Sequence, residues 1–454
     1  MKILVVGGGS GGHITPAVAV VREILKERPR TRVEFWTDKK YYRNVAKLAV
    51  ELGASYGTES RVSGKRHYVQ VRKIAAGKFR RYAGWKFTDY FKHFETTFKD
   101  LFIGNIFGFI GFISGIVVSF FRMMPRSSRP DAIFLKGGFV GLPVGIVARF
   151  YRIPYVIHES DVTPGLANRL LMSNAAVIAT NLPVEEIDGV EPDPRVVVTG
   201  VPVAPEFKKV SASRQKQLKK AFGFDDARPL VVITGGSQGA QHINEAVREI
   251  LPEMLKFASV GLVAGRARYE EMVDLKKYED WDNGKLKSNF RMWAFNSTMS
   301  ELMGAADVVV SRAGATTIAE LAALAKATIL VPFEKLPGGH QVKNAKRLVK
   351  LDAAEEVSDE RMVQQPGILL EKTQKLVRST RVRAELAAHL HETYKPDAAK
   401  DLAMILIGLA SDEAETLAVI EEVVEESKSS ESSAPKAKAD SDSDSDSLEG
   451  ANGK

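Results

Sequence analysis

Three glycine-rich turns in this chain have the residue types and spacing of phosphate-binding loops. They cover residues 7–12, 137–141 and 235–239. Each turn lies between a strand pattern of apolar residues and a helical pattern. Such a turn exposes backbone N–H groups that lie at the positive end of a helix dipole, and phosphates and diphosphates bind there. We therefore expect two α/β domains that bind more than one phosphorylated ligand.

His13 directly follows the first glycine turn, at the start of a helical pattern. An imidazole has a pKa near neutrality and can act as a general base, although it can also simply cap or pack against the loop. Gly7, Gly9 and Gly12 also fit the dinucleotide signature Gly-x-Gly-x-x-Gly, and Asp38 ends the second strand pattern, where an acid would hold a ribose. NAD binding therefore remains an alternative.

The second half of the chain adds a hydroxyl and a carboxylate to its glycine turn. Ser237 lies within that turn, and residues 311–317 form a further turn of small residues. Glu320 follows one turn into the next helical pattern, where a carboxylate can accept both hydrogen bonds of a ribose diol. The alternative is that Glu320 only complements the helix dipole. Gln341 follows a strand and a glycine-rich loop, from which it can reach a sugar hydroxyl.

Short apolar strands alternating with helices must position these turns. This alternation, with nearly continuous hydrophobicity in the strands, predicts parallel sheets covered on both faces. The expected strands are 3–6, 33–37, 132–135, 155–157, 176–179 and 196–199, then 230–234, 260–264, 308–310 and 328–331. The expected helices between them include 17–28, 166–172, 243–257 and 318–325.

Prolines and composition divide the chain. Two prolines at 202 and 205 mark a linker, so we expect one doubly wound domain over 1–202 and a second over 203–394. A final helix over 395–412 would return to the first domain. Residues 427–454 have the composition of a disordered acidic tail, and their Asp-Ser repeat lacks an apolar scaffold for a metal site.

The bulk composition is that of a cysteine-free, basic, globular protein. The formal net charge is +8, and residues 425–454 hold eight acidic residues against four lysines, so the remainder is still more basic. This excess suits polyanionic ligands such as nucleic acid, diphosphates or an anionic membrane surface. Without cysteine, neither a disulfide framework nor a thiolate metal site can form. The apolar run at residues 3–6 is too short for a signal peptide.

An apolar insertion over about 86–125 interrupts the first domain. Residues 101–121 contain no charge, which by length is sufficient for a transmembrane helix. A single crossing would, however, place strands of one sheet on opposite sides of the membrane. We therefore expect a hairpin or an in-plane element entering one leaflet, with a buried helix or a dimer interface as the alternative. The flanking basic residues are Lys78, Arg80, Arg81, Lys86, Lys92, Lys99, Arg122, Arg126 and Arg129.

Taken in order, the motifs resemble one family. They are Gly-Gly-x-Gly-Gly-His near the N-terminus, Gly-Gly-Ser-Gln-Gly-Ala at 235–240, Ser-Arg-Ala-Gly-Ala-Thr-Thr-Ile-Ala-Glu at 311–320, then Val-Pro-Phe and Gln341-x-x-Asn344-Ala345. This combination resembles the MurG family, the N-acetylglucosaminyltransferases of peptidoglycan synthesis that convert lipid I to lipid II. The resemblance covers most of residues 1–410. It implies a GT-B fold, with two doubly wound Rossmann-like domains whose parallel sheets face a cleft.

The resemblance also implies a role for each matching position. The catalytic residues would be His13, the base for the acceptor's C4 hydroxyl, and Glu320, which would bind the ribose. Gln341 would contact the GlcNAc, and the backbone near Phe295 and Asn296 would frame the uracil. The residues implied in donor binding are Ser10, Gly11, Gly12, Asp161, Ser237, Gln238, Phe295, Asn296, Ala315, Thr316, Glu320 and Gln341. Those implied at the acceptor diphosphate are Gly11, Gly12, Gly137, Gly138 and Gly141.

Four features depart from the family pattern. Asp161 stands where the family usually has asparagine, and Ala204 where it usually has arginine. The loop 338–340 reads Gly-Gly-His in place of the usual Asp-Arg-Gln. The fourth departure is the apolar insertion itself.

The expected function is transfer of GlcNAc from UDP-GlcNAc to the C4 hydroxyl of undecaprenyl-diphosphate-linked MurNAc-peptide, with inversion and without a metal or other cofactor. The expected partners are UDP-GlcNAc, lipid I and an anionic membrane surface bound through residues 78–129, with no nucleic acid; a homodimer is a further option. The protein would be peripheral or monotopic at the cytoplasmic face of the cell membrane. The alternatives are a related transferase with another lipid acceptor, such as diacylglycerol, and a non-catalytic nucleotide-binding protein.

Overall fold

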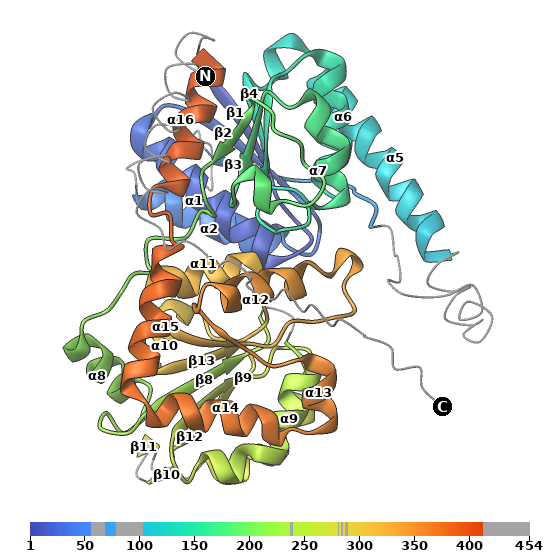
Figure 1. Cartoon of the computed structure of the whole chain (residues 1–454). Helices are drawn as coiled ribbons and strands as arrows, with labels where there is room; N and C mark the ends of the chain where they lie inside the picture. The colour runs from blue at the N-terminus through green and yellow to red at the C-terminus, as the bar shows by residue number, and fades with distance from the viewer. Residues whose placement is uncertain are drawn as a thin grey trace, which may run out of the picture.

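The computed structural model describes residues 1–55, 69–78, 103–236, 239–279, 281–282, 285–286 and 289–411. Two parallel sheets, each flanked by helices, form two domains (Figure 1). The N-terminal sheet has seven strands in the order β3-β2-β1-β4-β5-β6-β7. Their bounds are β1 (Lys2–Val6), β2 (Arg32–Thr37), β3 (Val69–Lys73), β4 (Ala132–Leu135), β5 (Tyr155–Glu159), β6 (Val177–Thr180) and β7 (Val196–Val198).

The C-terminal sheet has six parallel strands in the order β12-β9-β8-β13-β14-β15. Their bounds are β8 (Leu230–Thr234), β9 (Ser259–Val263), β12 (Phe290–Trp293), β13 (Val308–Ser311), β14 (Ala327–Leu330) and β15 (Glu355–Glu356). A separate antiparallel pair consists of β10 (Trp281–Asp282) and β11 (Lys285–Leu286). The central strands are buried on both faces, which accounts for their unbroken apolar sequences.

Helices cover the faces of both sheets. The N-terminal domain contains α1 (Gly11–Glu27), α2 (Tyr42–Ser55), α5 (Gly104–Met123), α6 (Gly141–Tyr151) and α7 (Leu166–Leu171). The C-terminal domain contains α8 (Ala212–Ala221), α9 (Gln241–Met254), α10 (Met299–Ala305), α11 (Ala315–Leu324), α12 (His340–Lys350), α13 (Asp359–Gln364), α14 (Gly367–Arg378) and α15 (Thr380–Glu392). The last helix, α16 (Ala398–Ser411), packs on α1 and β4, where Leu402, Ile405 and Leu406 join the N-terminal core.

Helix α1 begins earlier than the sequence suggested. It starts at Gly11, inside the glycine turn, so that His13 lies in its first turn. Pro16 lies within this helix and has no N–H. The carbonyl of Gly12, four residues earlier, therefore receives no helical hydrogen bond from Pro16 and is available to another donor.

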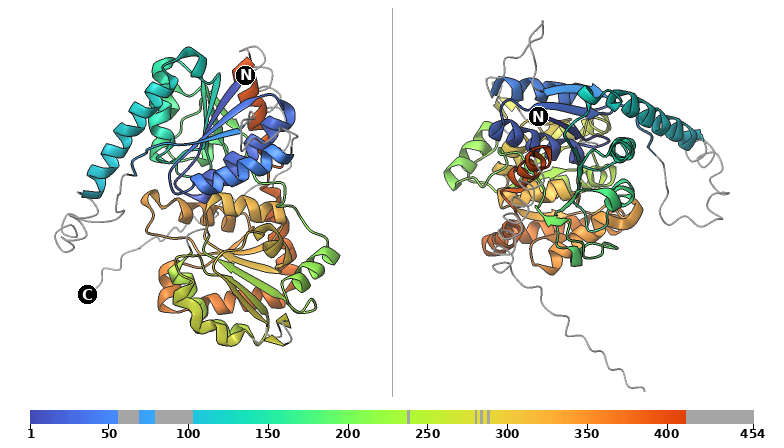
Figure 2. Two further views of the ribbon diagram at one scale, coloured as in Figure 1. Left: turned by 180° about the vertical axis from the view of Figure 1, so that it is seen from behind. Right: turned by 90° about the horizontal axis from the view of Figure 1, so that it is seen from above.

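The described part of the apolar insertion is one unbroken helix, α5, so a hairpin within residues 104–123 is the wrong interpretation. The helix lies at the edge of the N-terminal domain and extends away from it (Figure 2). It is long and apolar enough to cross a membrane by length and composition. The strands before and after it nevertheless pair in one sheet, as β1 and β4 do, which rules out a single crossing.

Glycines on one face of α5 allow the preceding segment to pack closely against it. A Cβ added at Gly108 would lie 3.0 Å from the carbonyl oxygen of Lys78, and one at Gly111 would lie 3.3 Å from that of Ala76. At Gly115 it would overlap the carbonyl oxygen of Ala75. The glycine stripe is therefore used within the chain, and the large apolar side chains of α5 lie outside this contact.

We expect Gly115→Ala to destabilise the protein by about 1–3 kcal/mol, because overpacking forces the backbone at Ala75 to move. Thermal denaturation measures this as a lower midpoint. Gly367→Ala at the start of α14 is the matched control, since a Cβ there meets no atom within 4 Å. Equal midpoints for the two variants would contradict the close packing of α5.

Candidate functional site

The first turn of α1 and the first turn of α11 meet between the domains. The hydroxyl of Thr316 donates to the carbonyl oxygen of Gly12 at 3.1 Å, the carbonyl that Pro16 leaves without a helical partner. The two expected phosphate-binding regions, one from each domain, therefore contact each other directly. Ala315, also expected at the donor, is buried at the start of α11.

His13 is held as a neutral proton acceptor. Its Nδ1 lies 2.9 Å from the carbonyl oxygen of Gly8 and 3.0 Å from Oγ of Ser10. A carbonyl oxygen only accepts, so we assign the proton to Nδ1, which leaves the lone pair on Nε2. Although the ring keeps some accessible surface, burial, followed by the charge of Lys136, lowers the pKa of His13 to about 4. Imidazole is therefore unprotonated at neutral pH.

The second glycine turn packs against this ring. Gly137 and Gly138 have φ values of +97° and +77°, in the left-handed region that favours glycine. A Cβ at Gly138 would lie 3.1 Å from Cε1 of His13. The N–H of Gly141, at the start of α6, donates to the carbonyl oxygen of Gly138 at 3.2 Å. The expected acceptor loop and the expected base are thus brought together.

Asp38 organises the first turn. Its carboxylate accepts the N–H of Gly9 at 2.6 Å and also the N–H groups of Lys40 and Tyr41. The NAD alternative requires this carboxylate to hold a ribose. Because it is engaged by the backbone of the turn itself, the alternative loses the feature that favoured it.

Asp161 connects the two domains. The side-chain amide of Asn344, on α12, donates to Asp161 Oδ1 at 2.7 Å and to the carbonyl oxygen of Ala313 at 3.1 Å. Asn344 Oδ1 in turn accepts the N–H of Val162 at 3.2 Å. Sequence reasoning quoted Asn344 only as part of a motif, and the structure makes it an interdomain bridge. Two more exposed ion pairs also join α12 to the N-terminal domain. Lys343 pairs with Asp188, and Arg347 pairs with Glu186.

A buried polar cluster lies behind Asp161, at the ends of β4 and β5. Glu159 accepts from the N–H groups of Ser160, Asp161 and Gly165 and from the amide of Asn168, and burial raises its pKa. Lys136 is 3% exposed and donates to Ser160 Oγ at 2.6 Å. Sequence reasoning missed Lys136. In the sequence, Lys136 is recognisable only as a charged residue that directly follows an apolar strand and directly precedes Gly137.

The remaining donor residues lie at the carboxyl ends of the C-terminal strands. Phe295 is 49% exposed, and the guanidinium of Arg266 lies 4.2 Å from its ring centre. Asn296 is buried, and its Oδ1 accepts from the N–H and hydroxyl of Thr298. Gln341 Oε1 accepts the N–H of Phe333 at 2.9 Å. Ser237 and Gln238 lie outside the described residues.

Glu320 lies one turn beyond Thr316 on α11. Burial raises the pKa of Glu320 from 4.5 to about 8. The side chain is therefore largely protonated at neutral pH. Accepting both hydrogen bonds of a diol requires it to lose this proton, a cost that the sequence did not reveal.

The raised pKa of Glu320 predicts a pH-dependent stability. The folded protein retains this proton between pH 4.5 and about 8, whereas the unfolded chain releases it, so stability falls as pH rises through this window. Glu320→Gln removes this contribution. We expect the midpoint of thermal unfolding to fall less from the acidic to the alkaline end of this window in the variant than in the wild type. The exposed Glu371→Gln should keep the wild-type dependence.

A cavity of about 850 Å³ lies between the domains next to the Asp161–Asn344 contact. It is bordered by Val201 and by Lys395, one from each of the two segments that join the domains. A change in the angle between the domains would therefore alter its volume. Among the residues that the structure describes, no group of three or more His, Asp and Glu side chains is placed to hold a metal ion.

Comparison with known families and proteins agrees with this geometry. Residues 42–180 match the glycosyltransferase family 28 N-terminal domain, and residues 230–402 match its C-terminal domain. A protein of Clostridium kluyveri is 32% identical over 377 residues, which cover 83% of this chain and 91% of the relative. One of Geobacillus thermodenitrificans is 32% identical over 361 residues, covering 79% and 86%. Both are named UDP-N-acetylglucosamine–N-acetylmuramyl-(pentapeptide) pyrophosphoryl-undecaprenol N-acetylglucosamine transferase.

Solved structures confirm the expected GT-B fold. MurG of Acinetobacter baumannii matches with a TM-score of 0.60 and 21% identity, over 89% of this chain and 99% of the other. The UDP-GlcNAc 2-epimerase of Neisseria meningitidis matches with a TM-score of 0.57 and 13% identity, over 90% and 100%. These likenesses show the fold, and the closer sequence relatives show the family. Since the matches cover both domains, this chain belongs to the MurG family within glycosyltransferase family 28.

Proposed function

We propose that the chain transfers GlcNAc from UDP-GlcNAc to the C4 hydroxyl of undecaprenyl-diphosphate-linked MurNAc-peptide, converting lipid I to lipid II. The observation that carries the proposal is His13, an unprotonated imidazole that packs against the acceptor loop and follows Gly12, the residue that contacts α11. The names of the relatives that share both domains support the choice of substrates.

The proposed reaction is a direct displacement at the anomeric carbon of GlcNAc. His13 Nε2 takes the proton of the acceptor's C4 hydroxyl while the hydroxyl oxygen bonds to the anomeric carbon. The bond from the anomeric carbon to the UDP oxygen breaks at the same time. The anomeric centre is thereby inverted. Backbone N–H groups of the glycine turns and the first turn of α11 stabilise the charge of the departing UDP. This assignment gives the diphosphate its counter-charge without a metal or other cofactor.

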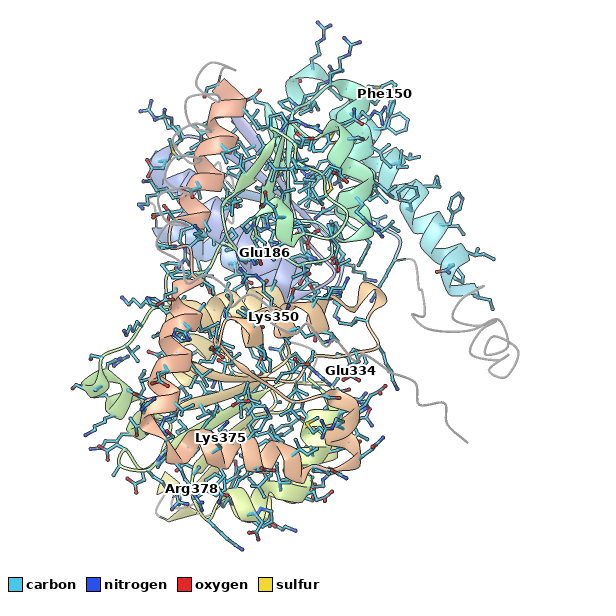
Figure 3. All side chains as sticks on the ribbon, in the orientation of Figure 1. Phe150, Glu186, Glu334, Lys350, Lys375 and Arg378 are labelled. Carbon is cyan, nitrogen blue, oxygen red and sulfur yellow. The ribbon has the colours of Figure 1, made fainter. Side chains whose placement is uncertain are left out.

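Membrane association forms part of the proposal. Large apolar side chains of α5 are exposed, including Phe107 at 68% and Phe121 at 60%. Phe150 at the end of α6 is also 68% exposed and lies 5.5 Å, between ring centres, from Phe120 of α5 (Figure 3). Exposed arginines at 126, 149 and 152 flank this edge. Apolar side chains beside basic ones suit insertion into one leaflet of an anionic membrane.

This arrangement would place the protein at the cytoplasmic face of the cell membrane, as a peripheral or monotopic protein. Its acceptor is a membrane lipid, so an in-plane α5 would keep the N-terminal domain, and with it the acceptor loop, near the lipid headgroups. Residues 79–102 of the proposed membrane-binding segment, and the acidic tail 427–454, lie outside the described residues.

Transfer of labelled GlcNAc from UDP-GlcNAc to a lipid I analogue tests the function. Turnover with inversion supports it, and EDTA should leave the rate unchanged if no metal takes part. Transfer only to diacylglycerol would favour the related lipid glycosyltransferase. Tight NAD binding together with no transfer from any UDP-sugar would favour a non-catalytic nucleotide-binding protein.

A further inference from the structure

Lys136 is a buried cation that the proposed displacement does not use. It follows β4 directly, is 3% exposed, and immediately precedes the glycine turn that packs on His13. An unneutralised ammonium in such a place is costly to bury, so its position calls for a physical explanation.

Hydrogen bonds fix the position of the Lys136 ammonium. Nζ donates to Ser160 Oγ at 2.6 Å, and that hydroxyl lies 3.3 Å from Nδ1 of His158. Nε2 of His158 lies 2.8 Å from the carbonyl oxygen of Gly200 and donates to it. Burial holds the pKa of His158 well below its ordinary value, so this ring stays neutral and adds no charge to the cluster. The chain of contacts holds the Lys136 charge in one place.

The charges around His13 come from three elements. Lys136 at the end of β4 and His340 at the start of α12 disfavour a proton on His13, whereas Asp161 after β5 favours one. Burial lowers the pKa of Lys136 to about 8, and the nearby carboxyl groups of Glu159 and Asp161 partly oppose this effect. Lys136 is therefore mostly charged at neutral pH.

We propose that Lys136 is a positioning residue for the transfer reaction. Its fixed positive charge keeps His13 ready to accept the acceptor's proton, and the negative charge of Asp161 opposes this effect. This inference rests on the proposed function in so far as His13 is the base of that reaction. Lys136 acts through His13 and makes no contact with the reacting atoms in this scheme.

The asparagine bridge extends this inference to domain closure. Asp161 is oriented by the amide of Asn344, which belongs to the other domain. The Asp161 carboxyl group, which opposes the effect of Lys136, is therefore held in this orientation only while the domains are in contact.

The test is an NMR titration of the His13 ring in the full chain without substrates, from about pH 3 to 8, a range that includes the expected pKa of about 4. In Lys136→Met we expect the pKa of His13 to rise by about one pH unit, because a nearby like charge has been removed. The acidic limb of the pH profile of kcat/KM should move upward by the same amount. Asp161→Asn should move the pKa of His13 downward, and the double variant should lie between the two.

Lys326→Met is the matched control. Lys326 is 7% exposed, and its pKa is also lowered to about 8 by burial, but its ammonium donates to the carbonyl oxygens of Gly304 and Ala306 in the C-terminal domain. This variant should leave the His13 titration at its wild-type position. If Lys136→Met does not fold, Lys136→Gln replaces it, since glutamine retains a donor for Ser160.

An unchanged His13 titration in a folded, uncharged Lys136 variant would overturn the inference even if the wild type transfers GlcNAc. Conversely, a wild type without transfer activity would remove the proposed function. A shifted titration in that case would still establish the electrostatic coupling of Lys136 to His13 and remove only its catalytic use. The substrate-free titration thus separates the two failures.

Discussion

Replacing His13 with alanine is expected to lower kcat for GlcNAc transfer by about 10²–10⁴-fold, the usual contribution of a positioned general base. The neutral ring presents Nε2 as the acceptor, because Nδ1 is committed to the Gly8 carbonyl. An alanine side chain has no hydrogen-bonding atom that could replace Nε2. The KM for UDP-GlcNAc should change little, since most of the expected donor contacts, Glu320 and Gln341 among them, lie in the C-terminal domain. Initial rates with a lipid I analogue measure both quantities.

His389→Ala is the control for a histidine outside the site. The Nδ1 of His389, on α15, lies 3.0 Å from the carbonyl oxygen of Asp352, far along the chain from the glycine turns. This variant should transfer at the wild-type rate. A His13→Ala enzyme that retains at least about a tenth of the wild-type rate would remove His13 as the base.

Sequence pattern predicted the interior of both sheets and the edge strand β7, but it missed the other three edge strands. Strands such as β1 and β8 are buried on both faces, so their sequences are unbroken apolar runs. The edge strands β3 and β12 read Val-Gln-Val-Arg-Lys and Phe-Arg-Met-Trp, mixing charges with apolar residues because one side meets solvent. The two-residue edge strand β15 consists of glutamates and carries no strand signal at all.

The candidate site was predictable where a local motif carries the chemistry. His13 and the glycine turns follow strand ends, so neighbouring strands bring them together. Lys136 and Asn344 could not be assigned in this way. The role of Lys136 depends on β5 lying beside β4, and that of Asn344 on α12 meeting the other domain. The pKa of Glu320 likewise depends on burial that no local pattern encodes.

Making the exposed face of α5 polar is expected to remove most binding to anionic vesicles. Phe107, Ile110 and Phe121 are 68%, 57% and 60% exposed and follow one another at helical spacing. If each contributes about 1 kcal/mol or more on entering the bilayer, the triple change to serine lowers partitioning by at least about 100-fold. Sedimentation with phosphatidylglycerol vesicles measures the loss. Transfer to a water-soluble acceptor analogue should be unaffected.

The matched control changes three exposed valines of the C-terminal domain, Val273, Val349 and Val363, to serine. These side chains are 39–49% exposed and lie away from α5, so vesicle binding should remain at the wild-type level. Membrane docking would be contradicted if the wild type did not bind vesicles but formed a dimer that the α5 substitutions disrupt. A second copy of the chain would then cover the apolar face. Loss of vesicle binding with an unchanged oligomeric state would instead place α5 at the lipid surface, where both the acceptor's diphosphate and its polyprenyl chain are found.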